Sequence, residues 1–508
     1  MPQQVLLTPA RQDLLALVAG AALPLAFSPV SWYPLAIACL AVLFVLWRDA
    51  APGRAAWRGL LFGFGQFGVG VSWLYVALHT YGQMPAALTA FVLVLFFVFL
   101  SCYPALVGWF QARLLAGAGP WAWILGVSAL WTLAEWLRGW LFTGFPWLAA
   151  GYSQIDGPLA GLAPWLGVYG VSLAVALSAA LLAEGWRRRN QPAVWSWVAA
   201  VAGLWLVAWA AGRVDWVRPA GAPLHVALVQ GDVPLSQKWS PGSGRSILRR
   251  YTDMTLAQHG GDLVVWPEAA VPYFRDQLEH GFLAGLQRAA EARHMDILLG
   301  ILERRRVHGR VRYYNSVISV GSAQGVYRKH HLVPFGEYLP FAAELGWMMN
   351  DLRIPMSDLS PGPAHQPPIQ VDGQAVGMSI CYEDAFGAEV MRALPRATLL
   401  ANVTEDAWYG HSLASFQQME MARMRALEGG RQMILSTNTG VTAIIGSHGQ
   451  VVARAPQFRR WVLTGTVVPL QGVTPYVRYG NRLVVWLLVL IAAGSVAARV
   501  RYGRGRPR

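Results

Sequence analysis

The chain is poor in charged residues and contains almost no lysine. Charged side chains account for 13% of its 508 residues and hydrophobic ones for 55%, whereas a soluble domain typically carries about 25% charged residues. Of its 41 basic side chains, only two are lysines. The composition excludes disordered, collagen-like and disulfide-rich secreted chains. It favours an integral membrane protein with room for one soluble domain of about 250 residues.

Cysteine is scarce as well. The chain has Cys39, Cys102 and Cys381; the number is odd and the first two lie in apolar runs, which does not support a disulfide framework. Neither CxxC nor HExxH occurs in the sequence, so we expect no metal ion, and we expect no cofactor. The net charge of +14 lies mostly beside apolar runs. Because the middle of the chain is near charge balance, we expect no nucleic-acid partner.

Eight apolar stretches are long enough, or nearly so, to cross a bilayer as helices. We predict spans at 12–29, 33–47, 58–79, 86–112, 120–138, 158–184, 193–211 and 482–498. A spanning helix needs about 20 mostly apolar residues, and the second stretch is short for that. Because seven further apolar stretches follow the first, we interpret it as an uncleaved anchor and not as a secretory signal peptide.

The arginines beside these stretches predict the orientation of the chain, because basic loops stay in the cytoplasm. All of them fall on one side if the N-terminus is cytoplasmic. They are Arg11, Arg48, Arg54, Arg58, Arg113, the run 187–189 and the arginines that follow residue 498. We therefore predict a multi-pass protein of the bacterial inner membrane with both termini in the cytoplasm. Its parts would be a seven-helix transmembrane domain at 1–219, a periplasmic domain at 220–475, and a final helix with a basic tail at 476–508.

The region 220–475 has the pattern of an α/β domain. Short apolar runs such as LHVALVQ, DLVVW, AVGMSI and TLLANV alternate with helical stretches, for example at 275–293 and 413–430. Strands that alternate with helices in this way predict layers of sheets and helices. Polar residues at the ends of such strands are where the chemistry of α/β domains usually lies.

Three residues of this region are candidates for such chemistry. Glu268 follows a strand and a proline, and Cys381 follows the strand-like run VGMSI. Lys329 is one of the two lysines; an ammonium is compact and its pKa can be tuned, whereas a guanidinium stays charged. Taken singly, each has an ordinary alternative, namely a structural turn for Glu268, chance retention for Lys329 and an inert buried thiol for Cys381.

The sequence blocks around these residues resemble those of a known superfamily. WPEAAVP, RKHHLVPFGEYLP and SICYEDAFG are similar to the triad blocks of the nitrilase, or carbon–nitrogen hydrolase, superfamily over roughly 224–470. With EWLRGWLFTGFPW, LVQGDVPLSQKW, DAWYG, MARMRALE and TNTGVTAIIG, nearly the whole chain resembles the bacterial apolipoprotein N-acyltransferases. That resemblance implies a membrane α-helical bundle of eight spans and a nitrilase-like domain with layered αββα architecture. One departure is local: the family often has Ser-Asn where this chain has Thr404 and Glu405.

The resemblance implies a ping-pong acyl transfer through a thioester on Cys381. Glu268 would act as the general base, and Lys329 would hold the developing oxyanion together with the backbone N–H of Tyr382. The implied donor is a phospholipid, usually phosphatidylethanolamine, which gives its sn-1 acyl chain. The implied acceptor is the α-amino group of the S-diacylglyceryl cysteine at the N-terminus of an apolipoprotein. Membrane lipids would surround the bundle.

Further residues follow from the same resemblance, each with an alternative. Glu337 would orient and charge Lys329, or be a helix cap or surface acid. Glu383 would be an acid beside the nucleophile, or form a plain ion pair. Trp239 would line the acyl or headgroup site, or pack in a core. We also expect Lys238 to lie in a surface loop and to tolerate arginine.

Two other functions would also account for these sequence features. A membrane-anchored C–N hydrolase would use the triad on small amides or nitriles. A transporter or lipoprotein-binding module would have no enzymatic activity, although secondary transporters usually carry broken helices and ionisable residues at mid-membrane. The segment 341–349 could form an amphipathic arm at the membrane interface, or a buried domain helix.

Overall fold

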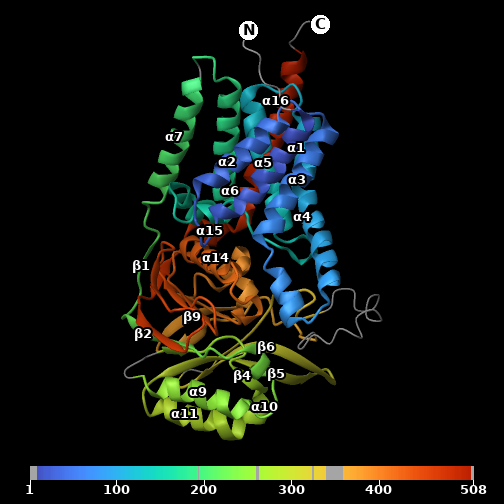
Figure 1. Ribbon diagram of the computed structural model, residues 1–508. Coiled ribbons are helices and arrows are strands. Elements are labelled where there is room, and N and C mark those ends of the chain that lie inside the picture. Colours follow the sequence, from blue (N-terminus) through green and yellow to red (C-terminus); the bar gives the residue numbers. More distant parts are fainter. Residues whose placement is uncertain (1–7, 193, 259–262, 323–324, 339–357, 505–508) are drawn as a thin grey trace. The chain divides into compact units, whose positions relative to one another are not determined.

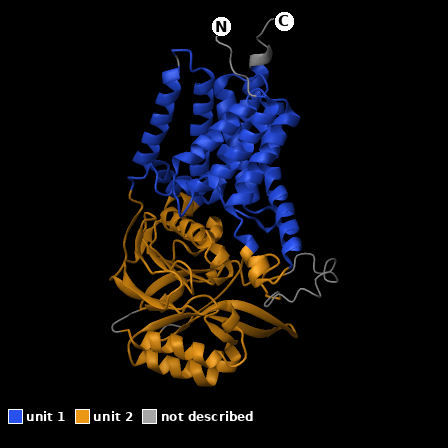
Figure 2. Cartoon of the chain, in the orientation of Figure 1, with its two compact units in different colours: residues 1–75, 85–214, 479–508 blue, residues 76–84, 215–478 orange. Residues whose placement is uncertain are grey.

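The computed structural model describes residues 8–192, 194–258, 263–322, 325–338 and 358–504 (Figure 1). The chain forms two compact units (Figure 2). Unit 1 comprises residues 1–75, 85–214 and 479–508, and unit 2 comprises residues 76–84 and 215–478. The predicted arm at 341–349 lies outside the described residues.

Unit 1 is built from helices. They are α1 (Pro9–Ala22), α2 (Pro34–Trp47), α3 (Pro52–Gly70), α4 (Ala86–Leu114), α5 (Pro120–Arg138), α6 (Ala163–Arg187), α7 (Val194–Ala211) and α16 (Asn481–Arg504). Proline stands at the first position of α1, α2, α3 and α5. Its missing N–H has no partner in the first turn of a helix anyway, and its fixed φ suits that position. The sequence therefore marks where these helices begin.

Helices of the described chain occupy each of the eight predicted apolar stretches. Among the described residues, four are long and apolar enough to cross a membrane, at Ala86–Leu114, Pro158–Arg187, Val194–Ala211 and Asn481–Arg501, and Pro34–Trp47 is a shorter apolar helix. Crossing by α1, α2, α3 and α5 stays a prediction. The third stretch ends earlier than expected, because α3 stops at Gly70. Residues Val76–Tyr81 form a separate π-helical turn, η2, that belongs to unit 2.

Unit 2 contains two large sheets. One has the order β14-β2-β3-β5-β6-β7, with β4 paired to β5, and the other has the order β13-β12-β11-β10-β9-β8. The first is formed by β2 (Leu224–Gln230), β3 (Leu263–Val265), β4 (Val271–Phe274), β5 (Asp296–Val307), β6 (Arg310–Val320), β7 (Val326–Arg328) and β14 (Trp461–Val467). The second is formed by β8 (Ile369–Val371), β9 (Gln374–Ile380), β10 (Leu399–Thr404), β11 (Met433–Thr437), β12 (Ala443–Ile445) and β13 (Val451–Arg454). A small third sheet pairs β1 (Val217–Pro219) with β15 (Leu470–Gly472).

Helices cover the outer faces of both sheets, which gives unit 2 four layers (Figure 1). On the first sheet lie α9 (Gly244–Leu256) and α11 (Ala284–Glu291), preceded by α10 (Arg275–Leu278) and η6 (Glu279–Leu283). On the second sheet lies α14 (Ala414–Gly429). The apolar face of α9 explains its position, because Ile247, Leu248 and Tyr251 recur at helical spacing and are buried against the strands. The predicted layering of helix, sheet, sheet and helix is confirmed.

The central strands of both sheets are parallel, and this brings their carboxyl ends to common edges. In the first sheet β2, β3 and β5 run parallel, and in the second β9, β10 and β11 do. The two sheets also meet directly, since the Ser436 hydroxyl of β11 donates to the Val265 carbonyl of β3 over 3.2 Å. Residues that follow β3, β9 and β10 are therefore placed to meet, as is usual for polar sites in sheets of this kind.

Candidate active site

Glu268 follows β3 after Trp266 and Pro267. A proline cannot donate to the ladder, so the strand ends here and the next side chain leaves the sheet. The Glu268 carboxylate is buried. Its Oε1 accepts a hydrogen bond from Asn315 Nδ2 of β6 at 2.6 Å, and its Oε2 accepts one from the backbone N–H of Glu405 at 2.8 Å. Two donors on two oxygens hold the carboxylate in one orientation.

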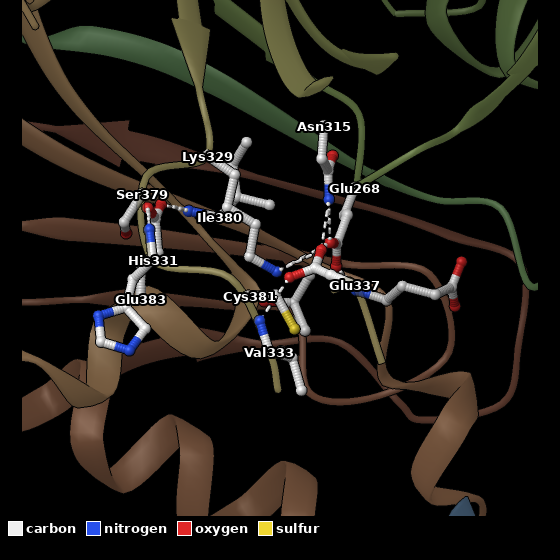
Figure 3. Close-up of polar contacts among 12 residues, drawn as sticks. Glu268, Asn315, Lys329, His331, Val333, Glu337, Ser379, Ile380, Cys381 and Glu383 are labelled. Atoms are coloured by element: carbon white, nitrogen blue, oxygen red, sulfur yellow. Dashed lines mark hydrogen bonds and ion pairs between the residues drawn. The ribbon is translucent and has the colours of Figure 1, made fainter. Parts of the chain in front are cut away.

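Lys329 follows β7 and is 1% exposed. Its Nζ lies 2.9 Å from Glu337 Oε1 and 3.6 Å from Glu268 Oε1. Figure 3 shows the ammonium facing these two carboxylates, with the Cys381 thiol beside them. Burial lowers the pKa of Lys329, but the carboxylates of Glu337 and Glu268 outweigh that effect and raise the pKa above its ordinary value. The lysine is therefore a fixed cation.

Glu337 is buried and forms an ion pair with Lys329, so it is not a surface acid. Its second oxygen, Oε2, accepts the backbone N–H of Val333 at 2.8 Å. Asn315 Nδ2 reaches Glu337 Oε1 at 3.3 Å as well as Glu268, so one amide contacts both carboxylates. Glu337 thus holds the lysine at a shorter distance than Glu268 does, and both carboxylates face its ammonium (Figure 3).

Cys381 is the first residue after β9 and opens the 3₁₀ turn η7 (Cys381–Ala385). Its φ of 54° lies in the left-handed region, which is costly for a residue with a Cβ, and strained residues of this kind cluster at functional sites. Burial raises the pKa of the thiol well above its ordinary value, the Glu268 charge raises it further, and Lys329 opposes both. The thiol is therefore protonated at rest and needs a base.

The backbone of Cys381 is held by Asn402, a residue that the sequence did not single out. Asn402 lies within β10, opposite Ser379 in the parallel register. Its Nδ2 donates to the Cys381 carbonyl at 3.1 Å and to Ser379 Oγ at 3.0 Å. The side chain thereby fixes the strained turn at the strand end.

Glu383 accepts four hydrogen bonds from uncharged donors. Its Oε1 accepts the backbone N–H groups of His330 and His331 at 2.7 and 3.0 Å. Its Oε2 accepts the backbone N–H of Ile380 at 2.7 Å and the Tyr327 hydroxyl at 3.0 Å. Burial raises the pKa of Glu383, and these donors act against that rise. Glu383 joins the loop after β7 to the end of β9, a different role from the plain ion pair considered above.

Tyr382 and Trp239 differ in exposure. The Tyr382 ring is buried against Phe386 and His331, with ring centroids 4.9 and 5.6 Å apart. Trp239 follows the short helix α8 (Leu235–Lys238) and is 37% exposed. Core packing therefore does not describe Trp239, and its indole is available to a ligand.

Lys238 is not in a surface loop, and that expectation was wrong. It ends α8, and this turn directs its side chain inward, where it is 3% exposed. Its ammonium forms an ion pair with Glu405 and donates to the Glu268 backbone carbonyl at 3.2 Å. The rarity of lysine, which singled out Lys329, applies equally to Lys238 and could have identified it.

A further acid, Asp406, lies in this region and was not predicted. Burial raises its pKa to about 7, and the Val441 backbone N–H, which donates to its Oδ2 at 3.4 Å, acts against that rise. The turn that it opens, η9 (Asp406–Tyr409), contacts η2, where Tyr81 meets Trp408 edge to face at 6.2 Å between ring centroids. Within the described part of the chain, no group of three or more His, Cys, Asp or Glu side chains is placed to hold a metal ion.

Comparison with known proteins accounts for both units. A family model for the apolipoprotein N-acyltransferase N-terminal domain matches residues 19–181, and one for carbon-nitrogen hydrolases matches residues 211–476. An apolipoprotein N-acyltransferase of Nitrosomonas europaea is 44% identical over 487 residues, which are 95% of this chain and 97% of that protein. Proteins of the same name from Methylococcus capsulatus and Azotobacter vinelandii are each 43% identical, over 95% and 96% of this chain and 94% and 95% of their own. Unit 2 thus has a nitrilase-like fold.

Proposed function

This chain belongs to the apolipoprotein N-acyltransferase family, and from that premise we propose that it moves an acyl chain from a phospholipid to the N-terminal α-amine of a diacylglyceryl apolipoprotein. The observation that carries the proposal is the buried cluster at the strand ends. In it the Lys329 ammonium lies 2.9 Å from Glu337 and 3.6 Å from Glu268, beside a cysteine in a strained turn. The family supplies the kind of reaction, and this cluster supplies groups that fit it.

In the first half-reaction, Glu268 removes the proton of the Cys381 thiol, whose pKa is raised by burial. The thiolate attacks the carbonyl carbon of the phospholipid ester, so that a C–S bond forms and a negative charge develops on the carbonyl oxygen. Lys329 and the backbone N–H of Tyr382 stabilise that charge. The C–O bond then breaks, and the lysophospholipid leaves with the proton from Glu268. An acyl thioester stays on Cys381.

In the second half-reaction, the α-amine of the apolipoprotein attacks the thioester carbonyl. A C–N bond forms, the same donors stabilise the oxyanion, and the C–S bond breaks. Glu268 takes the proton of the amine and returns a proton to the Cys381 sulfur. One base in one orientation therefore serves both steps, which fits the two hydrogen bonds that fix its carboxylate.

The surrounding residues act through Glu268, Lys329 and Cys381. Glu337 keeps Lys329 charged and in place, because it forms the shorter of its two ion pairs. Glu383 and Asn402 set the backbone at both sides of the nucleophile. Trp239 is 37% exposed and follows Lys238, whose ammonium contacts the Glu268 carbonyl; it would offer an apolar surface to the acyl chain or headgroup.

The setting of the reaction follows from the apolar helices. Four helices that are able to cross a membrane suit an enzyme whose donor is a membrane lipid. We propose that the donor is phosphatidylethanolamine, used at sn-1. From the arginine-rich loops we infer a bacterial inner-membrane enzyme with eight spans, cytoplasmic termini and a periplasmic unit 2.

Intact mass spectrometry of the purified protein tests the proposal. Incubated with phosphatidylethanolamine vesicles, the wild type should gain one acyl mass on Cys381 that hydroxylamine removes, and a diacylglyceryl peptide should remove it as well. Cys381→Ala should gain none. If no adduct forms and the protein instead releases ammonia from small amides, the membrane-anchored C–N hydrolase is the better description.

A further inference from the structure

We propose that the buried Lys238–Glu405 ion pair is a positioning device for Glu268, so that the chain uses both of its lysines in acyl transfer. The inference deepens the proposed function and rests on it. Neither member of the pair belongs to the Glu268–Lys329–Cys381 trio. The pair nevertheless contacts Glu268 twice, once at its main chain and once at its carboxylate.

The first contact comes from Lys238. Its ammonium donates to the backbone carbonyl of Glu268 at 3.2 Å and, at the same time, forms the ion pair with Glu405 Oε2. The side chain is 3% exposed, so water does not replace a lost partner. The lysine therefore fixes the peptide from which the base projects.

The second contact comes from the backbone of Glu405. Its N–H donates to Glu268 Oε2 at 2.8 Å. Its side chain is in turn held at both oxygens, because Asn438 Nδ2 reaches Oε1 at 2.9 Å and Oε2 at 3.3 Å. Asn438 also donates to the Val233 carbonyl at 2.7 Å, just ahead of α8. The loop that leads to Lys238 and the strand end that leads to Glu405 are thus tied together.

The charges explain why the pair should matter to the rate as well as to folding. A buried carboxylate whose cation is removed is strongly destabilising, because no solvent compensates its charge. In Lys238→Met the freed Glu405 charge would lie next to Glu268, whose carboxylate would be repelled and whose carbonyl would lose a donor. In Glu405→Gln the backbone N–H stays and the amide oxygen still accepts from Lys238, so the damage should be smaller.

A double-mutant cycle on the reactivity of Cys381 tests this directly. The rate of alkylation by iodoacetamide at fixed pH reports removal of the thiol proton without any lipid, and peptide mass spectrometry reads it at Cys381 alone. At matched folded protein, Lys238→Met should slow alkylation about 100-fold, as a base displaced by about 1 Å does. Glu405→Gln should slow it about tenfold. The double variant should fall between the two single variants, because the unpaired charge is gone but the Glu268 carbonyl still lacks its donor, whereas independent effects would multiply to about 1,000-fold.

Asp296→Asn is the matched control. Asp296 is buried in the same unit at the opposite end of β5, where its carboxylate accepts the backbone N–H groups of Ser322 and Asp372 at 2.7 and 3.2 Å. The Asp296→Asn substitution should lower the melting temperature and leave the alkylation rate of Cys381 unchanged. The inference would be overturned if the two single effects on the alkylation rate multiplied in the double variant. It would also be overturned if Cys381 in Lys238→Met were alkylated within threefold of the wild-type rate. If the cycle behaves as expected but lipid never acylates Cys381, the positioning role stands and the proposed function fails.

Discussion

Replacing Lys329 by arginine separates charge from shape at the site. The ammonium is 1% exposed and lies 2.9 and 3.6 Å from two carboxylates. Arginine keeps the charge, but its planar guanidinium is wider than an ammonium and donates in fixed directions. Because the side chain is buried against two carboxylates, the wider group has to displace a carboxylate or the acyl carbonyl, or move away from them. We therefore expect Lys329→Arg to acylate Cys381 poorly although it stays paired.

The size of the effect follows from two comparisons. Removal of one oxyanion donor costs about 10²–10³ in rate, and a misplacement of about 1 Å costs about 100-fold. Lys329→Arg and Lys329→Met should both fall in this range. Their stabilities should differ, since Lys329→Met leaves Glu337 and Glu268 without a cation at a cost of about 3–5 kcal/mol, whereas overpacking in Lys329→Arg costs about 1–3 kcal/mol. Similar rates with unequal stabilities would show that geometry governs the reaction and charge governs folding.

The assay is single-turnover acylation of Cys381 from phosphatidylethanolamine vesicles, followed by intact mass at matched folded protein. Arg249→Lys is the control. The Arg249 side chain is 85% exposed, so this substitution exchanges one cation for the other at the surface. It should acylate like the wild type. Acylation by Lys329→Arg within threefold of wild type would refute the reasoning and would mean that this residue supplies only diffuse positive charge.

Three further predictions concern the nucleophile, the orientation and an acid. Cys381→Ser should fold but form no hydroxylamine-labile adduct by intact mass; turnover by Cys381→Ala in a purified lipid assay would contradict the assignment. Single cysteines at 187–190 or 500–508 should resist impermeant thiol reagents in intact cells while one near Pro241 labels, and labelling of the tail from outside would break the topology. Because burial raises the pKa of Asp406 to about 7, the folded state holds a proton that the unfolded chain has lost, and stability should fall as the pH rises from about 4 to 7. Asp406→Asn should flatten that slope in melting temperature, and an unchanged slope would show that another group causes it.

The residues that the sequence identified can be recognised from their local sequence alone. Glu268 and Cys381 stand where an apolar run ends, and Lys329 is rare by type, so each can be found without knowing what it contacts. Their spacing within blocks similar to a known superfamily then joins them into one site. The layered architecture could be predicted in the same way, because alternating strands and helices restrict the possible arrangements.

The residues that the sequence missed have roles that arise only from tertiary contacts. Asn402 sits in the middle of an apolar strand, and its amide reaches Cys381 only through the pairing of β9 with β10. Lys238 follows polar residues that resemble a surface loop, and one turn of helix directs it inward. The apolar stretch 58–79 is divided for a related reason: α3 ends at Gly70, and hydropathy does not distinguish residues of a membrane span from those of η2 (Val76–Tyr81), which contacts η9.

The burial of both lysines has a consequence under the proposed mechanism, in which Cys381 carries a reactive thioester whose acyl chain goes to an amine. Lys238 and Lys329 are 3% and 1% exposed, and the chain has no third lysine. Its surface therefore presents guanidinium groups, which do not act as nucleophiles at neutral pH because they stay protonated, and no lysine side-chain amine. Such a protein is protected from acylating its own side chains, or those of a neighbouring copy, while it waits for its acceptor. Amine-reactive cross-linkers should accordingly find almost nothing to modify on the folded enzyme.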